Sequence, residues 1–277
     1  LLGPADLEIQ IPTYSSTATS NSDDYVCFSI PTGLTQDKKI RAIEVIPGNI
    51  QTVHHVLVSI DENASSSITV TSNCMAPMGD LVYEYAPGSL PIVYPIDSIN
   101  KFGVVLPSNS SIVLGMHYPE GSFGQLDSTK VRLYFYPQST VIRSITTEFL
   151  ISEGLPPDQP FTLPPNQITP ISSSFGPIMN DMSVMSVFPH MHLLGKEMEC
   201  FAVTPLNDTI NLIRVNNWDF EWQGFYFFKK FIKIPAGSMM YASGSYDNTV
   251  SSSNPNPVTV QSVYNTQDEM FVFLFQF

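Results

Sequence analysis

Short apolar segments separated by turn residues run through almost the whole chain, and this pattern leaves little room for helices. The segments either alternate polar and apolar residues or are wholly apolar, and none shows the 3.6-residue spacing of an amphipathic helix. The 23 prolines among 277 residues add interruptions that long helices do not tolerate. Many short strands about 8–12 residues apart are typical of antiparallel sandwiches and jelly rolls. We therefore predict an all-β fold.

The densest group of turn residues runs from Glu153 to Pro165, and strand-like segments continue on both sides of it. We predict two tandem antiparallel jelly-roll (β-sandwich) domains, residues 1–145 and 146–277. The expected strands are Leu7–Ile11, Tyr25–Ile30, Ile40–Ile46, Val53–Ile60, Ser67–Val70, Phe102–Leu106, Ile112–Tyr118, Val131–Tyr136 and Ile142–Leu150 in the first domain, and Ser183–Leu194, Met198–Thr204, Leu212–Asn216, Phe225–Ile234, Ser238–Tyr246 and Met270–Phe277 in the second.

All five histidines lie in or beside these apolar segments: His54, His55, His117, His190 and His192. Side chains two apart in a strand share a face, so His190 and His192 would project side by side. Neutral imidazoles bind metal ions through a nitrogen lone pair. A lone His-x-His pair is more often solvent-facing or hydrogen-bonded than metal-bound, but the other three histidines favour metal binding.

Copper and zinc are the metals that suit imidazole sites, and copper binds most strongly in the Irving–Williams order. A thioether ligand would favour Cu(I), and Met270 in Asp268-Glu269-Met270 is a candidate, although each of the 11 methionines taken alone is more often core filler. His54 and His55 should face opposite sides of an ideal strand. Both can reach one metal only at a strand end, a bulge or a twisted segment.

Taken together, these residues resemble the copper type II, ascorbate-dependent monooxygenases, the family of peptidylglycine α-hydroxylating monooxygenase and dopamine β-monooxygenase. The motifs are His54-His55, His117 in Gly-Met-His-Tyr, His190-x-His192 before Leu-Leu-Gly-Lys, and Met270 in Asp-Glu-Met. Further agreement, with the bacterial and related branches, lies in Trp218–Gln223, Tyr246–Thr249 and Asn254-Pro255. The resemblance extends from about Asp24 to the C-terminus.

The resemblance implies two jelly-roll domains that face each other across a solvent-filled cleft, with one copper ion each. His54, His55 and His117 would hold an electron-transfer copper in the first domain. His190, His192 and Met270 would hold a catalytic copper in the second, where O₂ is reduced and a substrate C–H bond is hydroxylated. The expected cofactors are two copper ions per chain with ascorbate as electron donor, and the expected enzyme class is an oxidoreductase, specifically a monooxygenase.

The sequence departs from the peptide-amidating branch at the substrate pocket. That branch holds its substrate's carboxylate with an Arg two residues before the His-x-His pair, and with an Asn and a Tyr two and four residues after the Met. Phe188, Val272 and Leu274 occupy these positions, so we expect a neutral or apolar small substrate and exclude peptidylglycine. Gly115 also replaces a larger polar residue, and we expect extra space beside His117.

Other functional interpretations remain open. One is a copper-binding or storage protein of the same fold without hydroxylase activity, and another is an adhesion or carbohydrate-binding sandwich with incidental histidines. Asp219 and Glu221 would share a strand face and suggest a carboxylate pair for sugar hydrolysis. We favour an exposed strand edge for them. The chain has no Gly-x-Ser-x-Gly, P-loop or His-Glu-x-x-His motif, so acyl transfer, nucleotide and zinc-protease chemistry gain no support.

Charge and hydropathy restrict partners and location. A formal net charge of −13 argues against nucleic acid and anionic membranes as partners. No run of about 18 apolar residues encodes a membrane span. Charged residues make up only 13% of the chain, and with its Ser/Thr-rich β pattern we expect a secreted protein, extracellular or periplasmic, whose signal peptide is absent from this chain. We also expect a monomer.

The three cysteines leave two alternatives. One disulfide with a remaining thiol is one alternative, and three thiols is the other. Cys27 and Cys74 flank the first histidine segment and are the pair we would join, leaving Cys200.

Overall fold

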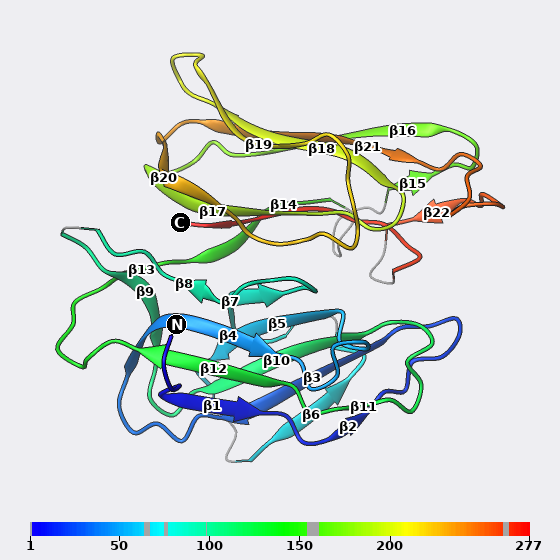
Figure 1. The fold of residues 1–277 in the computed structure, drawn as a ribbon. Helices are drawn as coiled ribbons and strands as arrows, with labels where there is room; N and C mark the ends of the chain where they lie inside the picture. The colour runs from blue at the N-terminus through cyan, green and yellow to red at the C-terminus, as the bar shows by residue number, and fades with distance from the viewer. Residues whose placement is uncertain (1, 64–66, 75–76, 98, 154–160, 263–265) are drawn as a thin grey trace. The chain divides into compact units, whose positions relative to one another are not determined.

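The computed structural model describes residues 2–63, 67–74, 77–97, 99–153, 161–262 and 266–277, and all regular elements in these ranges are β-strands. The all-β prediction is therefore confirmed. In the same ranges there is no helix with the length and apolarity needed to cross a membrane. The chain divides into two compact units, Leu1–Thr147 and Glu148–Phe277, coloured blue to green and green to red in Figure 1.

Unit 1 has a six-stranded sheet, a five-stranded sheet and a strand pair. The first sheet has the order β1 (Leu7–Gln10), β12 (Lys130–Phe135), β4 (Lys38–Ile46), β9 (Phe102–Leu106) and β13 (Arg143–Ser144), with β8 (Ile92–Val93) also on β4. The second has the order β6 (Thr69–Ser72), β3 (Asp24–Pro31), β10 (Ser111–Tyr118), β5 (His55–Asp61) and β7 (Asp80–Tyr85). The pair joins β11 (Leu126–Asp127) to β2 (Tyr14–Ser15).

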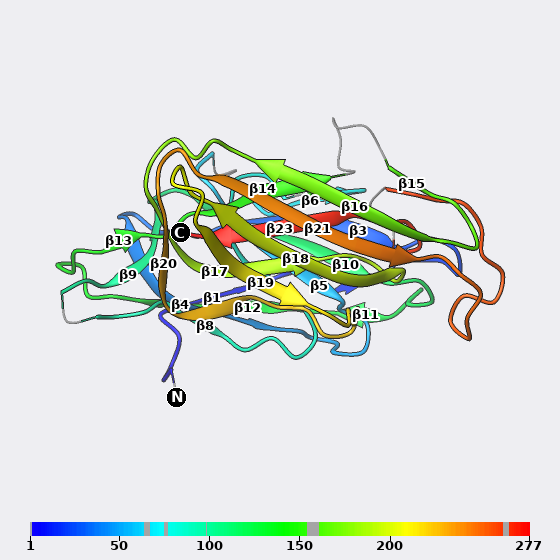
Figure 2. The ribbon, with the colours of Figure 1, turned by 90° about the horizontal axis from the view of Figure 1, so that it is seen from above.

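Unit 2 has two four-stranded sheets and another strand pair. One sheet has the order β14 (Thr147–Glu153), β23 (Phe271–Gln276), β17 (Met182–His190) and β20 (Tyr226–Ile234). The other has the order β16 (Ile168–Phe175), β21 (Met239–Asp247), β18 (Gly195–Val203) and β19 (Thr209–Val215), which lie side by side in Figure 2. The pair joins β15 (Thr162–Leu163) to β22 (Val260–Gln261).

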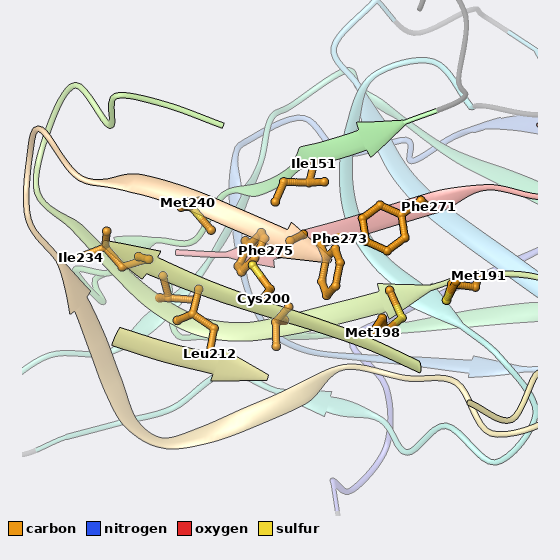
Figure 3. Close-up of a cluster of buried hydrophobic side chains, with 14 of the residues drawn as sticks. Ile151, Met191, Met198, Cys200, Leu212, Ile234, Met240, Phe271, Phe273 and Phe275 are labelled. Atoms are coloured by element: carbon orange, nitrogen blue, oxygen red, sulfur yellow. The ribbon is translucent and has the colours of Figure 1, made fainter. Parts of the chain in front are cut away.

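The core of unit 2 lies between its two four-stranded sheets (Figure 3). Alternate residues of β23, namely Phe271, Phe273 and Phe275, meet Met198 and Cys200 of β18 there. The intervening residues of β23 must face the other side of the sheet. This alternation matters for function, because it places the predicted ligands of unit 2 on the face away from the core.

Most predicted strands agree with the structure, but some differ from it in their bounds, and several strands were not predicted. The strand predicted over Ser183–Leu194 is too long, because β17 ends at His190. Ile142–Leu150 contains two separate elements, β13 and the start of β14. The strands β7 and β16 and the two-residue strands β2, β8, β11, β15 and β22 were not predicted. In β16 the serine-rich, largely exposed sequence gave no apolar run. Part of the predicted break, residues 154–160, lies outside the described residues.

The predicted Cys27–Cys74 disulfide is confirmed. The two Cα atoms are 5.5 Å apart, and Cys27 lies on β3, which pairs with β6 just before Cys74. Cys200 is buried in the core of unit 2. The cross-link closes a loop that contains His54 and His55, so it restricts the unfolded chain around the first histidine pair.

We predict that Cys27→Ser combined with Cys74→Ser lowers the free energy of unfolding of unit 1 by roughly 3 kcal/mol, because the unfolded state regains the entropy of an open loop. Denaturant unfolding under non-reducing conditions measures this change. Cys200→Ala is the matched control, since it removes a thiol without removing a cross-link. An unchanged midpoint in the double variant would contradict the prediction.

Candidate metal centres

The first candidate centre is formed by three histidines of unit 1. His117 on β10 is directly opposite His55 on β5 in the antiparallel register. One nitrogen from each of His54, His55 and His117 lies within 4.8 Å of the others. The Nδ1 atoms of His55 and His117 are 3.5 Å apart, close to the separation of roughly 3.3 Å for two nitrogens bound to one tetrahedral ion.

The start of β5 explains how adjacent histidines reach one point. The predicted strand Val53–Ile60 begins two residues later in the structure, at His55. His54 therefore precedes β5, and its side chain does not have to follow the alternation of side chains between the two faces of the strand. The His54 amide donates to the His117 carbonyl at 3.0 Å, and its ring centroid lies 4.2 Å from that of His55. The strand end is thus the feature that allows both rings to face one ion.

The extra space expected at Gly115 is absent. A Cβ atom at this position would lie 3.0 Å from the Pro77 Cδ and 3.5 Å from the Leu57 Cβ. The Pro77 ring, from a segment distant in sequence, already occupies the volume that a larger side chain would take. The sequence prediction failed because it considered only residues near His117 along the chain.

The second candidate centre lies at the end of β17 in unit 2. Met191 points into the core (Figure 3), and His190 and His192 have ring centroids 5.0 Å apart. His190 ends β17 and His192 lies beyond it, but both side chains are buried. The two rings therefore lie side by side as strand alternation predicts, with Met191 between them on the opposite side.

Hydrogen bonds show which ring nitrogen carries the proton in His190 and in His192. His190 Nδ1 lies 2.6 Å from Gln223 Oε1, and the Gln223 amide donates to the Phe220 carbonyl, which fixes which end of the amide is oxygen. His192 Nδ1 lies 3.0 Å from the Asp268 carbonyl. Carbonyl oxygens only accept, so both Nδ1 atoms carry protons and Nε2 is the lone-pair nitrogen of each ring. Histidines that bind metals are held in this way.

A buried carboxylate links the two segments that carry the predicted ligands. Glu269 accepts hydrogen bonds from the His192 amide at 2.8 Å and from the Leu194 amide at 2.6 Å. Burial raises the pKa of the Glu269 carboxyl to about 8, while the amide donors act in the opposite direction. The neighbouring Trp218 indole donates to the His192 carbonyl at 2.9 Å. The turn after β17 is therefore fixed from two sides.

Met270 directly follows the two residues that hydrogen-bond to His192. Phe188 is opposite Leu274 and His190 is opposite Val272, where the pairing ends. His192 and Met270 lie beyond the paired residues, and His192 bonds the Glu269 side chain and the Asp268 carbonyl, just before Met270. Met270 is half-buried, and its carbonyl accepts a hydrogen bond from the Tyr246 hydroxyl at 2.7 Å. Phe188, Val272 and Leu274 are buried on the same sheet face as His190.

The segment Trp218–Gln223 contributes more to this centre than the sequence suggested. Trp218 and Gln223 hold the histidines, and Phe220 lies 5.9 Å from the His192 ring. Asp219 and Glu221 are exposed, as favoured, but they lie in a turn and not on a strand edge. The agreement of this segment with the family motif was the only signal of its role.

Comparison with known proteins finds a family match for the C-terminal part of the chain. Residues 167–277 match the family model described as "Copper type II ascorbate-dependent monooxygenase, C-terminal domain". Unit 2 carries the signature of this family. The resemblance found in the motifs is thereby confirmed for these residues, and the general kind of function, copper- and ascorbate-dependent monooxygenation, is supported for the domain that contains His190, His192 and Met270.

Other comparisons add no argument. No curated protein matches the chain. Among solved structures, "PBCV-1 virus capsid, quasi-atomic model" is similar at 8% identity over 97% of this chain and 92% of that chain, with a TM-score of 0.30. A similarity at this level says nothing about function, so the account of the site depends on its own geometry.

We predict that Gln223→Leu weakens copper binding at the second centre about tenfold or more, because the His190 ring loses the acceptor that fixes its proton and orientation. Chelator competition on copper-loaded protein measures this affinity. Gln261→Leu, at an exposed position of unit 2, is the control and should bind as the wild type does. Equal affinities for both variants would show that the Gln223 contact does not support a metal ligand.

Proposed function

We propose that the chain is a two-copper monooxygenase that hydroxylates a C–H bond of a small neutral or apolar substrate with O₂ and an ascorbate-type reductant. The observation that carries the proposal is the pair of fixed histidines. His190 and His192 each donate the Nδ1 proton to a defined carbonyl oxygen. They lie close in the chain fold to the segment of Met270, within the residues that match the monooxygenase family. In this proposal each unit is a jelly-roll domain with one copper ion.

The donor sets of the two centres fit copper in different ways. Three imidazoles in unit 1 give an all-nitrogen set, which suits an ion that changes oxidation state with little rearrangement. The two imidazoles and one thioether of unit 2 suit Cu(I) and leave a coordination position open. Copper bound there would supply one-electron chemistry and the site of O₂ activation.

The residues of unit 2 have distinct roles in the proposal. His190 and His192 present Nε2 in fixed directions, and Met270 adds a weak soft ligand. Glu269 and Trp218 hold the turn that carries His192. These contacts would hold the ligand side chains, and any copper ion bound to them, in a constant place relative to the substrate, which is the main requirement for attack at one defined carbon.

The apolar residues near His190 determine the substrate class. Phe188, Val272 and Leu274 offer no charge and no side-chain hydrogen bond, and the Phe225 ring lies 5.2 Å from that of Phe188. A substrate site lined by these side chains would favour an apolar or neutral molecule, since a charged group would lose its hydration without gaining a partner.

The Cys27–Cys74 disulfide supports export, because such cross-links persist in oxidising compartments. We therefore propose a secreted or periplasmic protein that works as a monomer.

We predict that wild-type protein with copper and ascorbate consumes O₂ in step with hydroxylation of an apolar test substrate, and that His190→Ala and Met270→Ala lose this coupled turnover. Oxygen uptake and product analysis by mass spectrometry measure it. Met179→Ala is the matched control, since Met179 is a highly exposed methionine of unit 2.

Full turnover by the Met270→Ala variant would sink the assignment of the second centre. Tight copper binding by the wild type without any substrate-dependent O₂ uptake would instead support a copper-binding or storage protein of the same fold.

A further inference from the structure

A buried carboxylate lies against the histidine cluster of unit 1. Asp23 Oδ2 is 3.2 Å from His117 Nε2, and the two side chains are 1% and 7% exposed. Asp23 precedes β3, and β3 pairs with the strand that carries His117. The sequence gave no indication of this contact, because Asp23 and Asp24 occur together in a polar segment before the first long strand of unit 1.

Further contacts hold both groups in this arrangement. The other carboxylate oxygen of Asp23 accepts a hydrogen bond from the Glu120 amide at 2.9 Å. The Tyr25 ring is stacked on the His117 ring, with centroids 4.4 Å apart and planes 10° apart. The carboxylate therefore cannot easily turn to water, and the imidazole is fixed both at its Nε2 edge and on one face.

The contact decides which nitrogen of His117 faces the other histidines. A carboxylate oxygen next to a ring nitrogen is favourable only when that nitrogen carries a proton, so the proton lies on Nε2. The lone pair is then on Nδ1, the atom that lies 3.5 Å from His55 Nδ1. Asp23 thus orients His117 so that its unprotonated nitrogen, Nδ1, is directed at the other two histidines.

The negative charge of Asp23 also has an electrostatic consequence. A buried charge interacts more strongly with an ion of charge +2 than with one of charge +1, and the low local dielectric increases the difference. A carboxylate next to a ligating imidazole also makes that imidazole a better electron donor to the metal. Both effects favour Cu(II) over Cu(I) at the three histidines.

We propose that Asp23 is a positioning residue that biases the copper site of unit 1 toward the oxidised ion, so that the reduced ion there gives up its electron more readily. The inference rests on the proposed function only in assuming that His54, His55 and His117 bind copper. It adds a residue that sets the direction of electron flow from this site.

Asp24 provides a matched control at the adjacent position. Its carboxylate is buried too, but it accepts hydrogen bonds from the Tyr14 hydroxyl at 2.9 Å and the Thr17 amide at 2.7 Å, away from the histidines. Removal of the Asp24 charge should therefore affect local packing without changing the preference of the histidine cluster for one oxidation state.

The test compares Asp23→Asn and Asp24→Asn in the full chain, both in a His190→Ala/His192→Ala background that leaves only the first centre. Cu(II) and Cu(I) affinities are measured separately by competition with chelators selective for each ion. For Asp23→Asn we expect the Cu(II) affinity to fall about tenfold or more and the Cu(I) affinity to fall less. For Asp24→Asn we expect the ratio of the two affinities to be unchanged.

An unchanged ratio in the Asp23 variant, including an equal loss of both affinities, would overturn the inference and leave the proposed function intact. No copper binding by the background protein would overturn the first copper site itself, and with it the two-copper proposal. If Asp23→Asn does not unfold cooperatively, Asp23→Ser provides the same ratio with a smaller side chain.

Discussion

In both candidate centres, oxygen atoms outside the histidine cluster hold one ring nitrogen of a histidine in place. His190 is held by Gln223, His192 by the Asp268 carbonyl, and His117 by Asp23. Each acceptor fixes one proton, and the other nitrogen of the same ring becomes the donor atom. Without these contacts each imidazole would rotate and exchange tautomers, and the centres would exist only as averages over many arrangements.

The two units achieve this with the same structural device. In each, the histidines meet at the end of a strand: His54 lies immediately before β5, and His192 lies two residues after the end of β17. Only the adjacent pair His54 and His55 departs from strand alternation. A continuous strand would turn adjacent side chains to opposite faces and would also fix the spacing of alternate ones. Strand ends keep the backbone hydrogen-bonded on one side while they allow the extra rotation that converging rings need.

Local sequence patterns were sufficient to predict the all-β class, most strands and the side-by-side placement of His190 and His192. The grouping of the other ligand residues came from the family resemblance. Apolar runs such as the one in β23 predict buried strands, because this pattern can be recognised without knowing which distant residues the strand contacts. Gln223, Asp23 and Pro77 could not be predicted in this way, since each acts through a contact with a residue distant in sequence. The start of β5 and the end of β17 were also missed, because apolar residues continue beyond the last hydrogen-bonded pair of each strand. The assignment of one copper ion to each unit stays a prediction.

Copper stoichiometry tests the central claim most directly. Elemental analysis would follow copper loading and extensive buffer exchange of the wild type, of His55→Ala/His117→Ala and of His190→Ala/His192→Ala. The account predicts about two copper ions per chain for the wild type and about one for each double variant, because each pair removes most of one donor set. Wild-type protein without stoichiometric copper, or double variants that retain both ions, would contradict it.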